Sequence, residues 1–278
     1  MIMKSKILLF FPLVIASLQA ADERDLTITP NEAETECSVS DCLTTASGSL
    51  DIPSTYKGLP ITSIEESAFA DCSGLTSITI PNGIASISNS TFTGCSSLTS
   101  ITIPDSVTSI GEGAFDRCNS LTSINIPDSV TSIGDYAFGG CTSLVSITIA
   151  DNVTSIGHIA FIGTNISYDY TADNLNYLIS RSGQSAYLVD GASASGSVNI
   201  PTQVNSAYVK LISGGALRKC TSLTSVTIPD SVSSIGNYTF AGCTNLASIT
   251  IPDSVSSIGN STFAGCSSLN GITIPDSV

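Results

Sequence analysis

Few residues of this 278-residue chain have the type and spacing that catalysis requires. Nucleophilic catalysis of the Ser–His–Asp kind needs a histidine, and His158 is the only histidine in the sequence. It occupies a position of an internal repeat that elsewhere holds Glu112, Asp135, Asn237 and Asn260, a variety typical of a solvent-exposed position. The sequence therefore predicts a surface histidine and no catalytic residue.

The cysteines also lack the spacing of a metal or redox site. HExxH, CxxC, GxGxxG and P-loop patterns do not occur in the sequence. Seven cysteines share one repeat position, 23 residues apart within each run: Cys72, Cys95, Cys118, Cys141, Cys220, Cys243 and Cys266. We expect these thiols to stack as buried small hydrophobic groups, without metal or cofactor.

The first residues, MIMKSKILLFFPLVIASLQA, predict a cleaved secretory signal peptide over 1–20. Lys4 and Lys6 precede an apolar run from Ile7 to Leu18, and that run is shorter than the roughly 20 residues needed to span a bilayer. An uncleaved anchor is the alternative. No later segment is apolar for long enough to span, so we expect no membrane insertion after cleavage.

Secretion affects the expected chemistry of the remaining chain. Without Lys4 and Lys6 the chain has seven basic and 23 acidic residues, a formal net charge of −16 that argues against nucleic acid and anionic lipid as partners. Two cysteines lie outside the repeat series, in the segment ECSVSDC. In an oxidising compartment we expect Cys37 and Cys42 to form a disulfide that closes a small loop.

A 23-residue unit, clearest as LTSITIPDSVTSIGEGAFDRCNS over 98–120, recurs along most of the chain and predicts a solenoid. The alternation in LTSITIP predicts a strand with one buried face, which Pro104 ends. VTSI predicts a second short extended segment, and the spacing of Ala114, Phe115 and Cys118 favours about one turn of helix. Stacked coils should align one phenylalanine series into a continuous aromatic spine: Phe69, Phe92, Phe115, Phe138, Phe161, Phe240 and Phe263.

The unit L-x-S-I-x-I-P-x-S-V-x-S-I-G-x-x-A-F-x-x-C-x-S resembles the BspA-type leucine-rich repeat of bacterial and protist surface proteins. The resemblance implies a leucine-rich-repeat solenoid, an α/β repeat of mostly short parallel strands with short helical turns. It also implies a secreted or surface-exposed protein with a role in adhesion. It carries over no catalytic residue.

The period divides the chain into four parts after the signal. We expect an N-terminal cap over 21–49, a first array of repeats over 50–163, an inserted β-hairpin over 164–197 and a second array over 198–278. NYLIS and AYLVD flank RSGQ, a hairpin pattern. The second array stops part-way through a repeat, at IPDSV, which favours truncation of a longer protein.

Two groups of residues are candidate ligand contacts. An outward-facing hydroxyl row comprises Thr79, Thr102, Thr148, Thr227 and Thr250, and the insertion concentrates Tyr168, Tyr170, Tyr177 and Tyr187. Threonine also suits any exposed strand position, and hairpin packing explains the tyrosines equally well. A third row, of aspartates, suits a turn better than a Ca²⁺ site, because all its members but Asp151 follow a proline. It comprises Asp105, Asp128, Asp151, Asp230, Asp253 and Asp276.

These features predict a secreted or cell-surface protein that binds an extracellular protein or glycan without catalysis. The first alternative is an ice-binding or other crystal-surface protein that uses the Ser/Thr ladder. The second is a structural spacer of a longer surface protein. The weakest is a hydrolase with an acid pair in the insertion, where Asp169, Asp173 and Asp190 are the only candidates.

Overall fold

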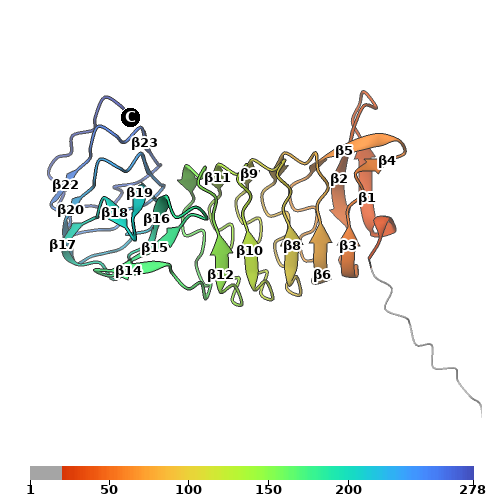
Figure 1. Ribbon diagram of the computed structural model, residues 1–278, viewed down its shortest axis with the longest axis horizontal. Coiled ribbons are helices and arrows are strands. Elements are labelled where there is room, and N and C mark those ends of the chain that lie inside the picture. The colour runs from red at the N-terminus through yellow and green to blue at the C-terminus, as the bar shows by residue number, and fades with distance from the viewer. Residues whose placement is uncertain (1–20) are drawn as a thin grey trace, which may run out of the picture.

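The computed structural model describes residues 21–278, which form a solenoid of stacked coils (Figure 1). The predicted signal peptide, 1–20, lies outside the described residues. Within residues 21–278, no helix is long and apolar enough to cross a membrane.

The N-terminal end of the stack is covered by a small mixed sheet with the order β1-β2-β5-β4. Its elements are the 3₁₀ helix η1 (Glu23–Asp25) and the strands β1 (Leu26–Pro30), β2 (Cys37–Cys42), β4 (Thr55–Tyr56) and β5 (Leu59–Ile64). β1 runs antiparallel to β2, while β2 runs parallel to β5 and so joins the hairpin to the first coil. Val39 and Ile64 are buried between the hairpin and the coil.

Each coil of the first array contributes one strand to each of two parallel ladders. The first ladder comprises β3 (Ser47–Asp51), β6 (Gly74–Thr79), β8 (Ser100–Thr102), β10 (Ser123–Asn125) and β12 (Ser146–Thr148), which pair as two sheets, β3-β6-β8 and β10-β12. The second comprises β7 (Ser86–Ile87), β9 (Ser109–Ile110), β11 (Ser132–Ile133) and β13 (Ser155–Ile156). Equivalent residues pair in register, as Ile78 does with Ile101, so each ladder stacks like on like.

The third side of each coil contains turns where a helical turn was predicted, so that detail of the sequence analysis was wrong. Across EGAFDRC the amide of Phe115 donates to the carbonyl oxygen of Ala137 in the next coil, at 2.8 Å. Only isolated tight-turn bonds stay within the coil, such as Cys118 N to Phe115 O at 3.1 Å. Because the amides bond between coils, the residues cannot form the i to i−4 bonds of an α-helix. Among residues 21–278, η1 is the only helix.

The aromatic spine forms, with one interruption. Ring centroids lie 5.2 Å apart for Phe69 and Phe92 and 5.3 Å apart for Phe92 and Phe115, and the stack continues through Phe138 to Phe161. The spine resumes at Phe240 and Phe263, whose centroids are 5.5 Å apart. Between the two runs, Leu217 takes the phenylalanine position, since its amide bonds Thr239 O as Phe115 N bonds Ala137 O. The expected continuity is therefore broken between the two arrays.

The ladder cysteines are free thiols, as the spacing predicts, and all are buried except the half-buried Cys266. Each thiol also donates a hydrogen bond to a carbonyl oxygen of the preceding coil: Cys95 Sγ lies 3.1 Å from Phe69 O, and Cys118 Sγ lies 3.2 Å from Phe92 O. Burial raises the pKa of the Cys95 thiol to about 12, so the thiol stays protonated at neutral pH.

The expected disulfide does not form. Cys37 and Cys42 are free thiols at opposite ends of the single extended strand β2. Five residues of strand separate their Cα atoms by about 16 Å, against the 4.4–6.8 Å that a disulfide requires. Cys42 instead extends the thiol ladder, because its carbonyl oxygen lies 3.6 Å from the Sγ atom of Cys72.

The insertion forms a hairpin that merges with the second array. A seven-stranded sheet comprises β14 (Tyr170–Ala172), β15 (Leu175–Ile179), β16 (Ser185–Asp190), β18 (Gln203–Val204), β19 (Ala207–Ile212), β21 (Ser234–Ile235) and β23 (Ser257–Ile258). β15 and β16 pair antiparallel around residues 181–184, and β16 then pairs parallel with β19. The other ladder of the second array comprises β17 (Gly196–Asn199), β20 (Leu223–Thr227) and β22 (Ser248–Thr250).

The solenoid changes direction where the two arrays meet. In Figure 1 the coils of the first array follow one another horizontally, whereas those of the second array rise toward the C-terminal end. A groove of about 300 Å³ lies between the second ladder of the first array and the strands β21 and β23 of the second array. Small polar residues line both walls, such as Ser155 and Ser257. We call the contact between the coil 158–164 and the coil 213–219, with the insertion beside it, the junction.

Candidate binding surfaces and the junction of the two arrays

The predicted threonine row lies on the outer faces of two separate ladders. Thr79, Thr102 and Thr148 belong to β6, β8 and β12 of the first array, and Thr227 and Thr250 belong to β20 and β22 of the second array. Thr79 pairs with Thr102, and Thr227 pairs with Thr250, each in register on neighbouring parallel strands. These four side chains are exposed, and Thr148 is half-buried. The row exists because strand residues alternate between faces, so each threonine is next to a buried or half-buried isoleucine or valine.

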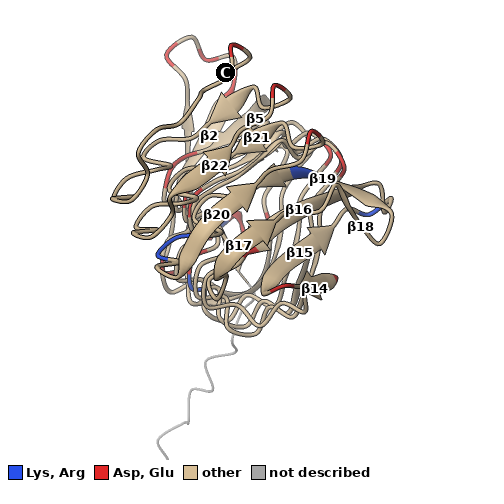
Figure 2. Cartoon of the chain, turned by 90° about the vertical axis from the view of Figure 1, so that its left-hand side faces the viewer, with Lys and Arg blue, Asp and Glu red and all other residues tan. Residues whose placement is uncertain are grey.

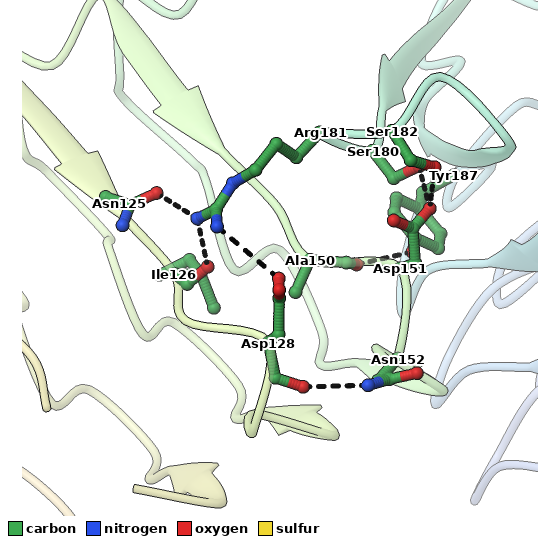
Figure 3. Close-up of polar contacts among 10 residues, drawn as sticks. All are labelled: Asn125, Ile126, Asp128, Ala150, Asp151, Asn152, Ser180, Arg181, Ser182 and Tyr187. Atoms are coloured by element: carbon green, nitrogen blue, oxygen red, sulfur yellow. Dashed lines mark hydrogen bonds and ion pairs between the residues drawn. The ribbon is translucent and has the colours of Figure 1, made fainter. Parts of the chain in front are cut away.

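The row is interrupted by the insertion. Asn125 stands at the threonine position of its coil and pairs with Thr148. The guanidinium of Arg181, from the turn between β15 and β16, donates to Asn125 Oδ1 and, at 3.3 Å, to Ile126 O (Figure 3). Its other terminal nitrogen lies 3.5 Å from Asp128 Oδ1. Within the described residues the hydroxyl row is therefore not continuous, which disfavours an ice-binding surface built on it.

The aspartate row supports the docked hairpin. Asp151 Oδ1 accepts hydrogen bonds from the hydroxyls of Ser180 and, at 2.7 Å, Ser182 (Figure 3). Partial burial acts to raise the pKa of Asp151, but these hydrogen bonds outweigh it and hold the pKa below its ordinary value. Across residues 21–278, no three His, Cys, Asp or Glu side chains gather in a group that could hold a metal ion.

Two of the four candidate tyrosines cannot contact a ligand. Tyr177 and Tyr187 are fully buried, because β15 and β16 lie within the sheet and alternate residues face the core. The Tyr187 hydroxyl donates to Ala150 O at 2.8 Å, and burial raises its pKa to about 12 (Figure 3). Tyr168, which is 36% exposed, and the half-buried Tyr170 remain as candidates.

His158 is buried, and the prediction of a surface histidine was wrong. Only 5% of the residue is exposed. Its ring lies between two tyrosines, with centroids 5.7 Å from Tyr136 in the preceding coil and 5.0 Å from Tyr238 in the second array. The sequence pattern missed this because periodicity shows which position a residue occupies in its own coil, whereas the neighbour beyond His158 is set by the insertion.

A glycine in the second array makes room for the ring. A Cβ atom at Gly215 would lie 2.4 Å from His158 Nδ1, closer than any real contact. The positive φ of Gly215, +70°, does not by itself explain why a glycine stands here. At the same repeat position Tyr136 has φ 53° and Tyr238 has φ 55°, so side chains are tolerated there. Gly215 is therefore required by the imidazole.

The environment of His158 disfavours its charged form. Its Nδ1 atom is buried and has no hydrogen-bond partner among the described residues. Burial lowers the pKa of His158, and the positive charge of Arg218 adds to that effect, while the carboxylate of Asp135 opposes it. The backbone amide of His158 donates to Asp135 Oδ1 at 2.6 Å, which fixes the carboxylate beside the ring. At neutral pH the imidazole is neutral.

A cavity of about 350 Å³ opens beside His158, and we call it the junction cavity. Three segments build it. The last coil of the first array supplies Phe161 and Ile162, the insertion supplies Tyr168 and Asp190, and the first coil of the second array supplies Arg218 and Lys219. Sequence reasoning did not select the two basic residues. The available signal was the segment ALRKC, which has two adjacent basic residues. The equivalent segments of the other coils have one basic residue, in AFDRC, or none.

The repeat pattern identifies the family. The model of the BspA type leucine rich repeat region matches residues 62–184 and 194–278, well over half of the chain, in six copies. The chain belongs to the BspA-type leucine-rich repeat family. The match leaves out residues 185–193, which contain the whole of β16. A comparison with curated protein sequences gives no match.

Solved structures similar to this BspA-type protein include leucine-rich repeat proteins. One is the leucine-rich repeat protein TpLRR of T. pallidum, 25% identical, with a TM-score of 0.47 over 90% of this chain and 91% of that chain. Another is a leucine rich cell surface protein of Faecalibacterium prausnitzii, 25% identical, with a TM-score of 0.34 over 91% of this chain and 88% of that one. The pneumococcal vaccine antigen PcpA is 18% identical, with a TM-score of 0.44 over 91% of this chain and 80% of that one.

Proposed function

We propose that this BspA-type protein is secreted or displayed at the cell surface, where it binds an extracellular protein or glycan without catalysis. The N-terminal segment 1–20 supports secretion, since it has the basic, apolar and small-residue regions of a signal peptide. The excess of acidic residues disfavours nucleic acid as the partner (Figure 2). A rigid solenoid suits this role because it presents many weak contacts on one extended surface.

The observation that carries the proposal is the free state of the row hydroxyls. Within the described residues, the hydroxyls of Thr79, Thr102, Thr227 and Thr250 make no hydrogen bond to protein, although all four are exposed. Another threonine row, in the first array, behaves differently. Its hydroxyls donate to carbonyl oxygens of the preceding coil, at 3.1, 3.3 and 3.2 Å for Thr108, Thr131 and Thr154. Free hydroxyls in register are available to both donate to and accept from a ligand.

Solid-phase binding of the purified protein to glycans, matrix glycoproteins and whole cells tests this function. Replacing Thr79, Thr102, Thr227 and Thr250 by valine removes the free hydroxyls and keeps the β-branched shape. We expect saturable binding by the natural protein and a loss of about tenfold or more in apparent affinity in this variant, because several weak contacts act together.

The matched control replaces Thr108, Thr131 and Thr154 by valine. The hydroxyls of these three threonines already donate to the backbone, so they are not free to bind a ligand. We expect the control to bind as the natural protein does. Absence of saturable binding by the folded natural protein would overturn the proposed function. Equal binding by both variants would move the contact surface away from the threonine row.

A further inference from the structure

We propose that the junction cavity binds a carboxylated sugar residue of an acidic glycan. The proposal rests on the proposed function and deepens it, since it names the class of ligand and a site for it. The cavity is independent of the threonine row, because it is built by the coil 158–164, the insertion and the coil 214–219.

Two unpaired cations give the cavity its charge. Arg218 and Lys219 are both exposed, and neither takes part in any ion pair or side-chain hydrogen bond found within residues 21–278. They are adjacent in a chain whose described part has only seven basic residues against 23 acidic ones. Two free cations side by side in so acidic a protein favour an anionic ligand, and a guanidinium matches a carboxylate with two parallel hydrogen bonds.

The remaining lining suits the rest of a sugar. A pyranose has an apolar C–H face and a set of hydroxyl groups. Tyr168, 36% exposed, and Ile162, 50% exposed, supply open apolar area for such a face. The Asp190 carboxylate can accept from hydroxyls, and it is held in place by Asn176 Nδ2 at 2.8 Å and by the amide of Ala192 at 3.2 Å.

The size and charge of the cavity favour a small ligand with a single negative charge. A volume of about 350 Å³ lies in the range of ligand pockets, roughly 300–1,000 Å³, and holds one or two sugar residues. The negative Asp190, which also lines the cavity, disfavours a multiply charged phosphate group. A ligand with a single carboxylate next to several hydroxyls complements this lining, because the carboxylate can pair with the two cations and the hydroxyls can donate to Asp190.

Isothermal titration calorimetry on the intact protein, with a disaccharide that contains glucuronic acid, tests the site directly. The neutral glucose disaccharide of the same linkage measures the contribution of the carboxylate, and an acidic peptide and a sulfated disaccharide test other anions. We expect saturable binding of the glucuronic acid compound and at least about tenfold weaker binding of the neutral compound, which lacks the charge, and of the peptide, which lacks the sugar hydroxyls. The sulfated compound has both features and should bind less tightly, because a sulfate spreads one charge over three oxygens and each of them is a weaker acceptor than a carboxylate oxygen.

The variant Arg218→Gln/Lys219→Gln removes both cations, and we expect it to lose at least about tenfold in affinity. Arg117→Gln is the matched control, because Arg117 occupies the repeat position of Lys219 with nearly the same backbone, φ 58° against 60°, outside the cavity. Tyr168→Ala should also weaken binding, whereas Tyr208→Ala, at an exposed tyrosine away from the cavity, should not. Circular dichroism establishes that each variant is folded.

Three results would overturn the proposal: no saturable binding of the glucuronic acid compound, equal affinity of the double glutamine variant, or preference for the peptide, the sulfated or the neutral compound. These results differ from failure of the proposed function. If the proposed function fails, the natural protein binds no glycoprotein, glycan or cell. If only the cavity proposal fails, binding through the threonine row remains.

Discussion

The regular coils of the first array and the junction use the same backbone scheme with different side chains. In the regular coils each side chain contacts the equivalent residue of the next coil. Phenylalanine stacks on phenylalanine, with centroids 5.2–5.3 Å apart, and each thiol donates to the carbonyl oxygen of the phenylalanine in the preceding coil. At the junction the backbone bond persists, from Ile159 N to Gly214 O at 2.9 Å, but the chain has advanced 56 residues from His158 to Gly214 instead of 23.

This difference separates stability from specificity. A coil that repeats its neighbours can carry only features that the neighbours also have, so its surface is a row. The junction brings together coils that differ, and there Leu217 replaces the stacked phenylalanine and Gly215 accommodates His158. Single side chains such as Arg218 and Tyr168 can form an individual site only where the repetition stops. The following predictions test this division.

The largest effect is expected in the regular stack. Phe115→Ala removes a fully buried ring between two stacked neighbours and should lower the free energy of unfolding by about 3–5 kcal/mol, measured by urea denaturation. Arg117→Gln, at an exposed residue of the same coil, should change it by less than about 0.5 kcal/mol. A loss below about 1 kcal/mol for Phe115→Ala would mean that the spine contributes little to stability.

At the junction, a single methyl group should be destabilising. Gly215→Ala places a Cβ 2.4 Å from His158 Nδ1 and should cost about 1–3 kcal/mol, because the buried ring must move. Gly140→Ala is the matched control, since Gly140 has a similar φ, +65°, but its nearest neighbouring atom lies at 3.5 Å. Equal losses in the two variants would attribute the effect to backbone angle and not to the histidine.

The regular coils were largely predictable from the sequence. A fixed period determines that like residues stack, so the 23-residue unit was enough to predict the parallel ladders, the buried thiols and most of the aromatic spine. The helical turn was mispredicted because Ala114, Phe115 and Cys118 have the same spacing in a helix as in successive turns. Periodicity does not show whether an amide bonds within its coil or to the next coil.

The junction was not predictable in the same way. The burial of His158, Tyr177 and Tyr187 depends on which strands the insertion places beside them, and a single hairpin pattern does not specify its neighbours. The pair Cys37 and Cys42 illustrates the same limit, since proximity in sequence favoured a loop whereas pairing with β5 extends the segment as a strand. The threonine row was locatable because it belongs to the repeat, and the junction cavity was not.

The junction should also respond to pH. Because burial lowers the pKa of His158 below its ordinary 6.5, the unfolded chain binds a proton more readily than the folded chain as pH falls through this range. The stabilising contribution of the neutral ring is therefore present above about pH 6.5 and decreases below it. We expect Tm to fall between pH 7.5 and pH 5.5 by a larger amount in the natural protein than in His158→Asn, measured by thermal unfolding at several pH values.

Asparagine is suitable for this comparison because it stands at the same repeat position in Asn237 and Asn260. The charged groups that face the ring, Arg218 and Asp135, are unchanged in the variant, so the difference between the two pH profiles reports the histidine. Parallel pH profiles would show that protonation of His158 is not linked to folding.

The smallest effect is expected where the insertion docks on the regular array. Arg181 is half-exposed, and its partner Asp128 is largely exposed, so Arg181→Gln should lower the free energy of unfolding by at most about 1 kcal/mol in urea denaturation. Arg181→Lys keeps the charge but not the planar donor fork, and it distinguishes the ion pair with Asp128 from the hydrogen bonds to Asn125 and Ile126.

Other contacts of the insertion explain why this loss should be small. The Tyr187 hydroxyl donates to Ala150 O at 2.8 Å inside the core, and the Ser182 hydroxyl donates to Asp151 Oδ1 at 2.7 Å at the surface. A loss above about 2 kcal/mol for Arg181→Gln would contradict this order of contributions, because exposed ion pairs rarely contribute so much. It would also mean that a single surface residue fixes the insertion in place, and that the geometry of the junction cavity depends on Arg181 as well as on the residues that line it.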